Sequence, residues 1–343
     1  MEIITIATLK RATMDGRVEA VVRGQADSLK RKETRDQKPY WELTLADAES
    51  KVTLRAWSDS PAFSFCEQMA RGEFLEVSGE FVHNAAFGTD ARRWTCRRLE
   101  EDEREALLAG PPELREKQNA DYEFIARAVE SLGDPRLRAL GLAFLGDWGE
   151  RFRRTAAARN YHHARRGGLV EHTAQMMRAA EAVSAVYPHL NRDLLLAGVL
   201  FHDCGKLWEN ALPENGFAMP YSETGELLGH IPVGIELVNA LWRKLDFTAW
   251  AGLEPASEEV RLHLLHLIAA HHGEKQFGSP VDPKTPEAFA LHHLDNLDAK
   301  MEILAAGYET AQELAPGIFE RVRPLPGNFV RPLSRFAPPS PSA

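Results

Sequence analysis

The chain has 343 residues, of which 44% are hydrophobic and 27% are charged, so it is long enough for two packed domains and excludes wholesale disorder. Its longest apolar stretch, residues 194–201, falls far short of the roughly 20 residues that cross a bilayer. The N-terminus lacks the features of a secretory signal, and three cysteines without CxxC spacing exclude a disulfide framework. We therefore expect a cytoplasmic protein with no membrane partner.

The net charge of −9 is unevenly distributed along the chain. Residues 1–99 contain 16 Lys and Arg against 15 Asp and Glu, so the acidic surplus lies in the remainder. Twelve of the 13 histidines also follow residue 100. Acidic residues together with histidines are typical of metal-binding sites, so the second part of the chain is the candidate metal-binding part.

Residues 1–100 show the alternating pattern of short strands. Strands are expected at residues 16–26, 40–46, 52–57, 74–81 and 93–97, with one helix within residues 59–71. Five strands with a single helix between the third and the fourth match the order of an OB-fold, a small β-barrel. A sandwich of the same size produces the same pattern, so both alternatives stay open on pattern alone.

The hydrophobic period becomes helical from about residue 121. Helices are expected at residues 172–186, 191–201, 231–245, 258–271 and 286–306, with Asn191 and Thr285 as N-caps. We predict a multidomain chain with a small β-barrel (OB-fold) at residues 1–100, a connector at 101–120, an all-α domain at 121–314 and a Pro-rich tail at 315–343. The end of that tail is expected to be disordered.

An adjacent His202 and Asp203 follow an apolar stretch in the sequence LLLAGVLFHDCGK. A charged pair at the end of a buried helix costs several kcal/mol unless a partner compensates it, and a divalent metal ion is such a partner. The alternative is a helix that ends at the surface and exposes both side chains to water.

Further His and Asp residues lie beside apolar residues, near expected helix ends or turns. They are His172 in GGLVEHT, His230 in LLGH, His271 and His272 in LIAAHHGE, and Asp295 in HHLDNLDAK. With the His–Asp pair they supply enough donors for two metal ions, and the two carboxylate oxygens of Asp203 allow it to bridge them. Asp298 lies one helical turn after Asp295, where it is expected to support the site by hydrogen bonding.

The order H, HD, H, H, D resembles the HD-domain superfamily of metal-dependent phosphohydrolases. The sequences YHHARRGGLVEHT, LLLAGVLFHDCGK and GELLGHI resemble more specifically the YhaM-type 3′→5′ exoribonucleases, which join an N-terminal OB-fold to a C-terminal HD domain. The resemblance runs from about residue 12 to about residue 310. It implies a metal-dependent phosphodiesterase with two divalent ions.

Each site residue follows from this resemblance by its position in the motifs. One metal is expected to be bound by His172, His202, Asp203 and Asp295, and a second by Asp203, His230 and His271, with His272 as the alternative to His271. Lys206 is expected to face the scissile phosphate, so Asp203 and Lys206 are the predicted catalytic residues. Manganese is the expected metal, while cobalt, iron, nickel, magnesium and zinc also suit these donors.

Candidate substrate contacts near the metal ligands are His163, Arg165 and Arg166. These residues suit a phosphate, although hydrogen-bonding or solvated surface roles fit the sequence equally well. A basic run between the first two expected strands supplies Lys30, Arg31, Lys32, Arg35 and Lys38. Tyr40 and Trp41 follow that run, and Trp57 lies on the next strand. Exposed rings there would stack on bases, whereas rings on alternate strand positions fill the core.

The resemblance implies a 3′→5′ exonuclease that hydrolyses single-stranded RNA to nucleoside monophosphates, with single-stranded DNA as a further substrate left open. The resemblance also suggests a homo-oligomer. The main alternative is a phosphohydrolase of small nucleotides whose OB-fold serves regulation or assembly. A non-enzymatic nucleic-acid-binding module conflicts with the complete ligand set, and a di-iron oxygenase would leave the OB-fold without a role.

Overall fold

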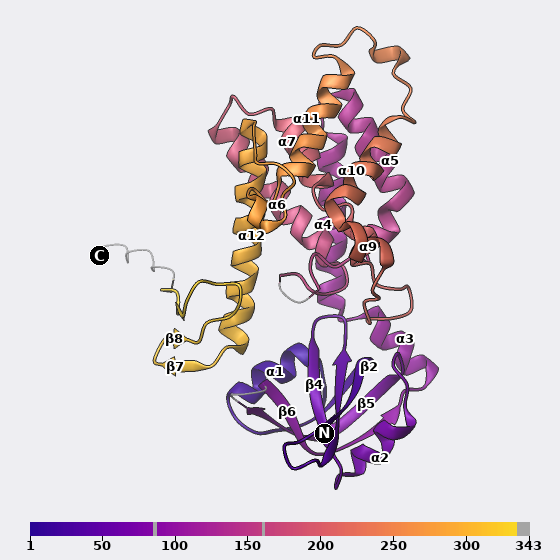
Figure 1. The fold of residues 1–343 in the computed structure, drawn as a ribbon, viewed down its shortest axis with the longest axis vertical. Helices are drawn as coiled ribbons and strands as arrows, with labels where there is room; N and C mark the ends of the chain where they lie inside the picture. The colour runs from indigo at the N-terminus through magenta and orange to yellow at the C-terminus, as the bar shows by residue number, and fades with distance from the viewer. Residues whose placement is uncertain (85–87, 160–161, 335–343) are drawn as a thin grey trace, which may run out of the picture.

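The computed structural model of the protein describes residues 1–84, 88–159 and 162–334. A β-sheet region forms one end of the elongated molecule, and a bundle of helices forms the other end (Figure 1). Helix α12, Pro286–Thr310, runs along the side of the bundle toward the sheet region and ends beside a small C-terminal sheet (Figure 1). Within the described ranges, every helix is too short or too polar to span a lipid bilayer.

The N-terminal sheet has six strands. Its path is β4–β3–β2–β5–β6 with antiparallel neighbours, and the short β1 pairs in parallel with β2. The strands are β1 Ile3–Ile4, β2 Val18–Glu33, β3 Pro39–Ala46, β4 Lys51–Trp57, β5 Phe74–Asn84 and β6 Gly88–Arg98. Two helices belong to this region, α1 Ile6–Met14 and α2 Pro61–Gln68.

The sheet curls until its two outer strands approach each other. The backbone N–H of Arg55 on β4 donates to Asp90 Oδ1 on β6 at 3.1 Å, and Trp94 Nε1 donates to the Arg55 carbonyl oxygen at 3.0 Å. Among the described strands no backbone ladder joins β4 to β6, so side chains form this seam. Alternate residues such as Leu43 and Leu54 fill the interior. The predicted strand order, with α2 between the third and fourth long strands, is confirmed.

The remainder of the chain is largely helical, as predicted. Its helices are α3 Glu101–Ala109, α4 Pro112–Glu130, α5 Pro135–Phe152, α6 Gly168–Val186, α7 Arg192–Phe201, α8 Lys206–Glu209, α9 Glu223–Leu228, α10 His230–Trp242, α11 Ser257–Ala270 and α12, with 3₁₀ helices η1 Thr248–Trp250 and η2 Lys275–Phe277. Asn191 caps α7 by accepting a hydrogen bond from the N–H of Leu194. Thr285 caps α12 in the same way through Ala288, so both predicted caps are confirmed.

Two connecting segments differ from a plain reading of the sequence. Helix α4 begins at Pro112 and continues past residue 121, so the expected connector and the helical region share one helix. The Pro-rich tail contains a sheet of β7 Glu313–Ala315, β8 Ile318–Phe319 and β9 Phe329–Val330, packed by its two phenylalanines against Tyr308 of α12. Strands of two or three residues are too short to show alternation. The predicted disorder at the chain end falls on residues 335–343, outside the described residues.

The basic run also differs from the expected loop. Strand β2 continues to Glu33, so Lys30, Arg31 and Lys32 lie on a strand, and only residues 34–38 turn back into β3. A two-stranded ribbon that projects into solvent buries neither face. Hydrophobic alternation therefore stops before the strand does, and the sequence pattern does not show the true end of β2.

The sheet region and the helical region pack directly on each other. Gln25 of β2 accepts hydrogen bonds through Oε1 from the N–H groups of Phe217 and Ala218, at 2.6 and 2.9 Å. The ring of Phe217 meets Phe74 of β5 edge to face, within a shared apolar cluster. The segment between α8 and α9 is thereby fixed to the sheet.

Candidate metal centre and nucleic-acid surface

The His202–Asp203 pair lies directly after α7, whose residues 194–201 are all buried. His202 exposes 0% of its surface and Asp203 3%, so the alternative of a helix end open to water is wrong. Gly205 permits α10 to approach this turn closely, because a Cβ there would lie 1.9 Å from the carbonyl oxygen of His230. The glycine two residues after Asp203 therefore sets the distance between two parts of the site.

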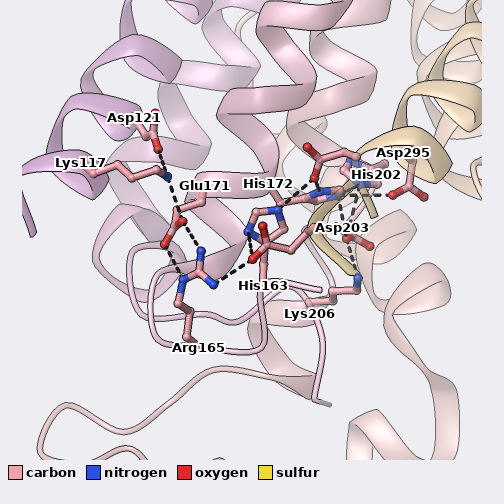
Figure 2. Close-up of polar contacts among 12 residues, drawn as sticks. Lys117, Asp121, His163, Arg165, Glu171, His172, His202, Asp203, Lys206 and Asp295 are labelled. Carbon is pink, nitrogen blue, oxygen red and sulfur yellow. Dashed lines mark hydrogen bonds and ion pairs between the residues drawn. The ribbon is translucent and has the colours of Figure 1, made fainter. Parts of the chain in front are cut away.

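Six predicted ligands converge from separate parts of the helical region. They are His172 on α6, His202 and Asp203 after α7, His230 at the start of α10, His271 after α11 and Asp295 on α12. His172 Nε2 lies 3.2 Å from His202 Nε2 and 3.4 Å from Asp295 Oδ1. Figure 2 shows His172, His202, Asp203 and Asp295 gathered at one place.

The two carboxylate oxygens of Asp203 face two different groups of nitrogen atoms. Oδ2 lies 3.4 Å from His202 Nε2 and 3.8 Å from His172 Nε2. Oδ1 lies 3.5 Å from His230 Nε2 and 3.7 Å from His271 Nε2. Asp203 therefore stands between two donor groups, which is the arrangement of a bridging carboxylate.

The other ring nitrogen of each histidine is held by an oxygen acceptor. His202 Nδ1 and His271 Nδ1 each lie 2.8 Å from the carbonyl oxygen three residues earlier in the chain. Asp298 Oδ2 lies 2.7 Å from His172 Nδ1, so Asp298 supports His172 across the site, in addition to sharing a helix with Asp295. Such contacts fix the ring orientation and direct Nε2 toward the centre.

Three atoms test whether these residues fit a metal ion. Asp203 Oδ1, His230 Nε2 and His271 Nε2 are buried and have no hydrogen-bond partner in the described part of the chain. Buried polar atoms are normally paired, and a shared divalent cation would satisfy all three at once. Imidazole nitrogens with carboxylate oxygens are suitable donors for such ions, so the residues fit a divalent metal.

The charges of the centre depend on one another. Burial opposes the charged form of His172, but contacts with Asp295 and Asp298 outweigh burial and raise the pKa of His172 to about 9. Burial also opposes the charged form of Asp203, but the charges of Lys206 and His202 hold its pKa well below the usual value. Lys206 Nζ lies 2.6 Å from Asp203 Oδ2, so the lysine lies at the centre beside the shared carboxylate (Figure 2).

His272 lies beside the second donor group but is held differently. Its Nδ1 lies 2.8 Å from the carbonyl oxygen of Phe277. One donor atom each from His230, His271 and His272 lies within 4.8 Å of the others. The approach of His271 to Asp203 favours His271 as the residue that shares a metal with Asp203, and His272 stays the alternative.

Three predicted substrate contacts have protein partners in the structure. His163 exposes 1% of its surface, and its Nε2 lies 3.1 Å from Asp298 Oδ2, so it supports that carboxylate. Arg165 lies 2.6 Å from Glu171 (Figure 2) and 2.9 Å from Glu302. Arg166 donates to the carbonyl oxygens of residues 213, 214 and 216. Substrate binding by these three residues therefore stays a prediction, and the structure adds protein partners that the sequence does not show.

Two supporting carboxylates are absent from the sequence-based prediction. Glu209 Oε2 lies 3.1 Å from His230 Nδ1, and Glu302 lies within ion-pair distance of both Arg165 and His163. Helical spacing would have indicated both residues. Glu209 follows Lys206 by three residues on α8, and Glu302 follows Asp298 by four on α12, and residues so spaced share one face of a helix.

The predicted nucleic-acid surface divides between the two faces of the sheet. Cross-strand pairing places Lys32, Tyr40 and Trp57 in one row. The rings of Tyr40 and Trp57 lie 4.8 Å apart, and Trp57 is 43% exposed. Arg31 pairs with Trp41 on the other face, where Trp41 packs against the sheet core. The stacking prediction therefore fits Tyr40 but not Trp41, and Trp57 takes its place.

The remaining basic residues of the run are exposed. Lys30 shares the face of Lys32 because the two are separated by one residue on β2, while Arg35 and Lys38 lie in the turn. Lys32 Nζ lies 2.6 Å from Glu42, so part of the positive charge is neutralised locally.

Comparisons with known proteins agree with this architecture. Residues 169–300 match the model of the HD domain. A 3′-5′ exoribonuclease YhaM of Oceanobacillus iheyensis is 30% identical over 289 residues, which are 83% of this chain and 84% of that protein. Another, of a Geobacillus species, is 30% identical over 301 residues, or 86% of each chain.

Among solved structures, RecG bound to a three-way DNA junction matches 29% of this chain and 13% of that chain, with 16% identity and a TM-score of 0.24. This likeness is too low to carry an argument. The two relatives, in contrast, match along most of both chains, and this chain matches the HD domain where the candidate metal ligands converge. The chain therefore belongs to the family of YhaM 3′-5′ exoribonucleases.

Proposed function

We propose that this protein is a metal-dependent 3′→5′ exonuclease that hydrolyses single-stranded RNA to nucleoside monophosphates. The observation that carries the proposal is the position of Asp203, whose two oxygens face two separate groups of imidazole nitrogens. The polarity and the RNA substrate come from the family, whose relatives are named 3′-5′ exoribonucleases.

The centre has residues for two ions. His172, His202, Asp203 and Asp295 would hold one divalent ion, and Asp203, His230 and His271 would hold a second. When bound, a pair of divalent ions polarises a phosphodiester and lowers the pKa of water. Mixed imidazole and carboxylate donors suit manganese, with cobalt, iron, nickel, magnesium and zinc as alternatives.

The chain's own residues supply orientation and charge. Asp298 and Glu209 fix the rings of His172 and His230, so the ligand atoms need no rearrangement. Lys206 places a cation beside Asp203, where it adds to the positive potential that a phosphodiester meets on entering the site. The buried surroundings strengthen these interactions because they exclude water.

The sheet region binds the body of the strand. Tyr40 and Trp57 present neighbouring rings beside Lys32, and aromatic rings stack on any base because every base has a π-face. Basic residues nearby bind the backbone without reading its sequence. This surface therefore gives affinity for single strands, with single-stranded DNA as a second substrate to be tested.

A time course on a 5′-labelled RNA strand with Mn²⁺ tests this function. We expect products that shorten stepwise from the 3′ end, release of nucleoside monophosphates, and survival of a matched strand whose 3′ hydroxyl carries a bulky blocking group. Products cut internally would contradict the polarity. Hydrolysis of free nucleotides at the rate of the strand would instead support a small-nucleotide phosphohydrolase.

A further inference from the structure

A cavity of about 630 Å³ lies where the sheet region meets the helical region. Its walls come from α1, the β3–β4 turn, α4 and α12, together with Arg159, Arg165 and residues 322 and 323. Figure 1 shows α1 and the loops at the upper edge of the sheet region facing the lower ends of α4 and α12. The cavity therefore lies between the aromatic pair on the sheet and the metal centre in the bundle.

The charge of this cavity is opposite to that of the whole chain. Seven lysines and arginines and four glutamates line it, a surplus of three positive charges in a protein whose net charge is −9. Arg165 and Lys117 neutralise Glu171, and Arg11 lies 3.7 Å from Glu309. Glu171, Glu302 and Glu309 thus have cationic partners.

Three cations of the wall form no ion pair with a carboxylate in the described residues. Lys10 Nζ donates to the Ser50 hydroxyl at 2.9 Å, and burial lowers its pKa more than the charge of nearby Asp47 raises it. Arg159 donates to carbonyl oxygens of residues 209, 219 and 220. Arg323 also lines the cavity. A phosphate oxygen would compensate such charges more strongly than neutral acceptors do.

The cavity is continuous with the sheet surface in one direction. Strand β4 turns the side chains of Lys51, Thr53, Arg55 and Trp57 to one face, because alternate residues share a face. Lys51 lines the cavity, and Trp57 lies at the other end of this row, about 20 Å away at roughly 3.3 Å per residue. Lys10, Lys51 and Thr53 also line a second cavity of about 300 Å³ alongside β4.

In the other direction the cavity reaches residues that contact a candidate metal ligand. Its wall includes Glu302, whose Oε1 lies 2.9 Å from Arg165 and 3.8 Å from His163 Nδ1. His163 in turn contacts Asp298, which holds His172. A series of side-chain contacts thus connects the cavity wall with a predicted metal ligand.

We propose that this cavity binds the backbone phosphates of a single strand on its way from the Tyr40–Trp57 pair to the metal centre. The proposal rests on the proposed exonuclease function, since it assigns that substrate a path. Surplus positive charge, cations that form no ion pair with a carboxylate in the described residues and continuity with the β4 row support a polyanionic chain as the occupant.

The test compares the full-length protein with the double variant Lys10→Gln/Arg323→Gln. A matched control, Arg243→Gln/Lys244→Gln, removes two exposed cations beyond the far end of α10. Fluorescence anisotropy in EDTA measures binding of a labelled oligouridylate of about 16 nucleotides over a salt series. Hydrolysis of a dinucleotide with Mn²⁺ measures the metal centre alone.

We expect the cavity variant to bind the long strand about tenfold more weakly or worse, because it loses two charge-assisted contacts. The log–log salt slope should flatten by about 1.4, at about 0.7 per phosphate contact on single strands. Dinucleotide hydrolysis and the control variant should both match wild type.

Wild-type affinity and salt slope in the cavity variant would overturn the proposal while leaving the exonuclease function intact. Equal losses on the dinucleotide would also overturn it, since they would show a structural defect. Weaker inhibition by a nucleoside monophosphate with unchanged strand binding would make the cavity a product site instead. Weakened strand binding without any hydrolysis by wild type would support the cavity and refute the proposed function.

Discussion

The metal centre and the sheet surface arrange their charged groups in opposite ways. At the centre, donor atoms are buried and each ring is held by a second contact, as His172 is by Asp298. On the sheet, Lys30, Arg35 and Lys38 are exposed on a ribbon and a turn. Fixed, desolvated groups suit chemistry, because they need no reorganisation, and exposed cations suit salt-sensitive binding of a strand. The difference supports the proposal that the helical region carries catalysis and the sheet region affinity.

The largest expected effect comes from Asp203→Ala. Asp203 is the residue that faces both donor groups, so its loss disrupts both at once. We expect hydrolysis to fall by about a thousandfold or more, because metal ions supply several kcal/mol and about 1.4 kcal/mol is tenfold in rate. Initial rates on an end-labelled strand measure this, with circular dichroism as the folding control. Retention of a tenth of the wild-type rate would refute the claim that both donor groups depend on Asp203.

A change on the sheet should affect affinity and spare the chemistry. For Tyr40→Ala/Trp57→Ala we expect a KM for long strands that is roughly 5- to 150-fold higher, since stacking contributes about 1–3 kcal/mol per base. The kcat at saturation should be unchanged, because these rings bind ground state and transition state alike. Phe289→Ala, an exposed aromatic on α12, is the matched control. A fall in kcat with constant KM would contradict the proposal that the sheet region supplies affinity and the helical region catalysis.

Asp298→Ala tests whether support of a ligand ring matters for metal binding. Removing the acceptor of His172 Nδ1 should weaken Mn²⁺ binding about 10- to 100-fold, as measured by isothermal titration calorimetry. Asp298→Asn keeps one oxygen acceptor and should recover part of the affinity. Equal affinities for wild type and both variants would show that Asp298 contributes packing alone.

The smallest effect should come from Asp134, which caps α5 away from the centre. Its side chain accepts from the N–H groups of Arg136 and Leu137, and Asp134→Ala should cost about 1 kcal/mol. Burial raises its pKa, but the Arg136 contact and the backbone contacts outweigh it, so the pKa is lowered on folding. Its contribution is therefore full above the usual pKa and disappears as the pH falls through the lower, folded value.

Thermal unfolding at neutral and acidic pH checks this prediction. The melting temperature of Asp134→Ala should fall by about 2–4 °C at neutral pH, and the gap to wild type should close in acid. The kcat should equal that of wild type. A larger difference in melting temperature at acidic pH would contradict a pKa of Asp134 that is lowered on folding.

The convergence of the candidate metal ligands was predictable from the family motifs and from the residue types that metal chemistry requires. An adjacent His202 and Asp203 at the end of an apolar helix is costly without a partner, and this cost is visible in the sequence. The pairing of Arg165 with Glu302 was not predicted, because Glu302 lies on a helix more than a hundred residues later and only its spacing from Asp298 points to the site. Charge alone does not distinguish an arginine that binds substrate from one that holds two glutamates.

The order of the strands in the sheet was predictable, but the face on which each side chain lies was less so. Strand order follows from short alternating segments and the helix between them. Which ring is exposed depends on register, and Tyr40 and Trp41 look alike in the sequence although they point to opposite faces. The end of β2 was hidden for a related reason, because its last residues are charged on both faces.

Counting bound metal tests the central claim most directly. Equilibrium dialysis against Mn²⁺ followed by elemental analysis gives the number of ions per chain in wild type and in Asp203→Ala. The account predicts two ions for wild type, and fewer than one for the variant, because both donor groups depend on Asp203. One ion in wild type that remains bound in Asp203→Ala would contradict a centre shared through this carboxylate.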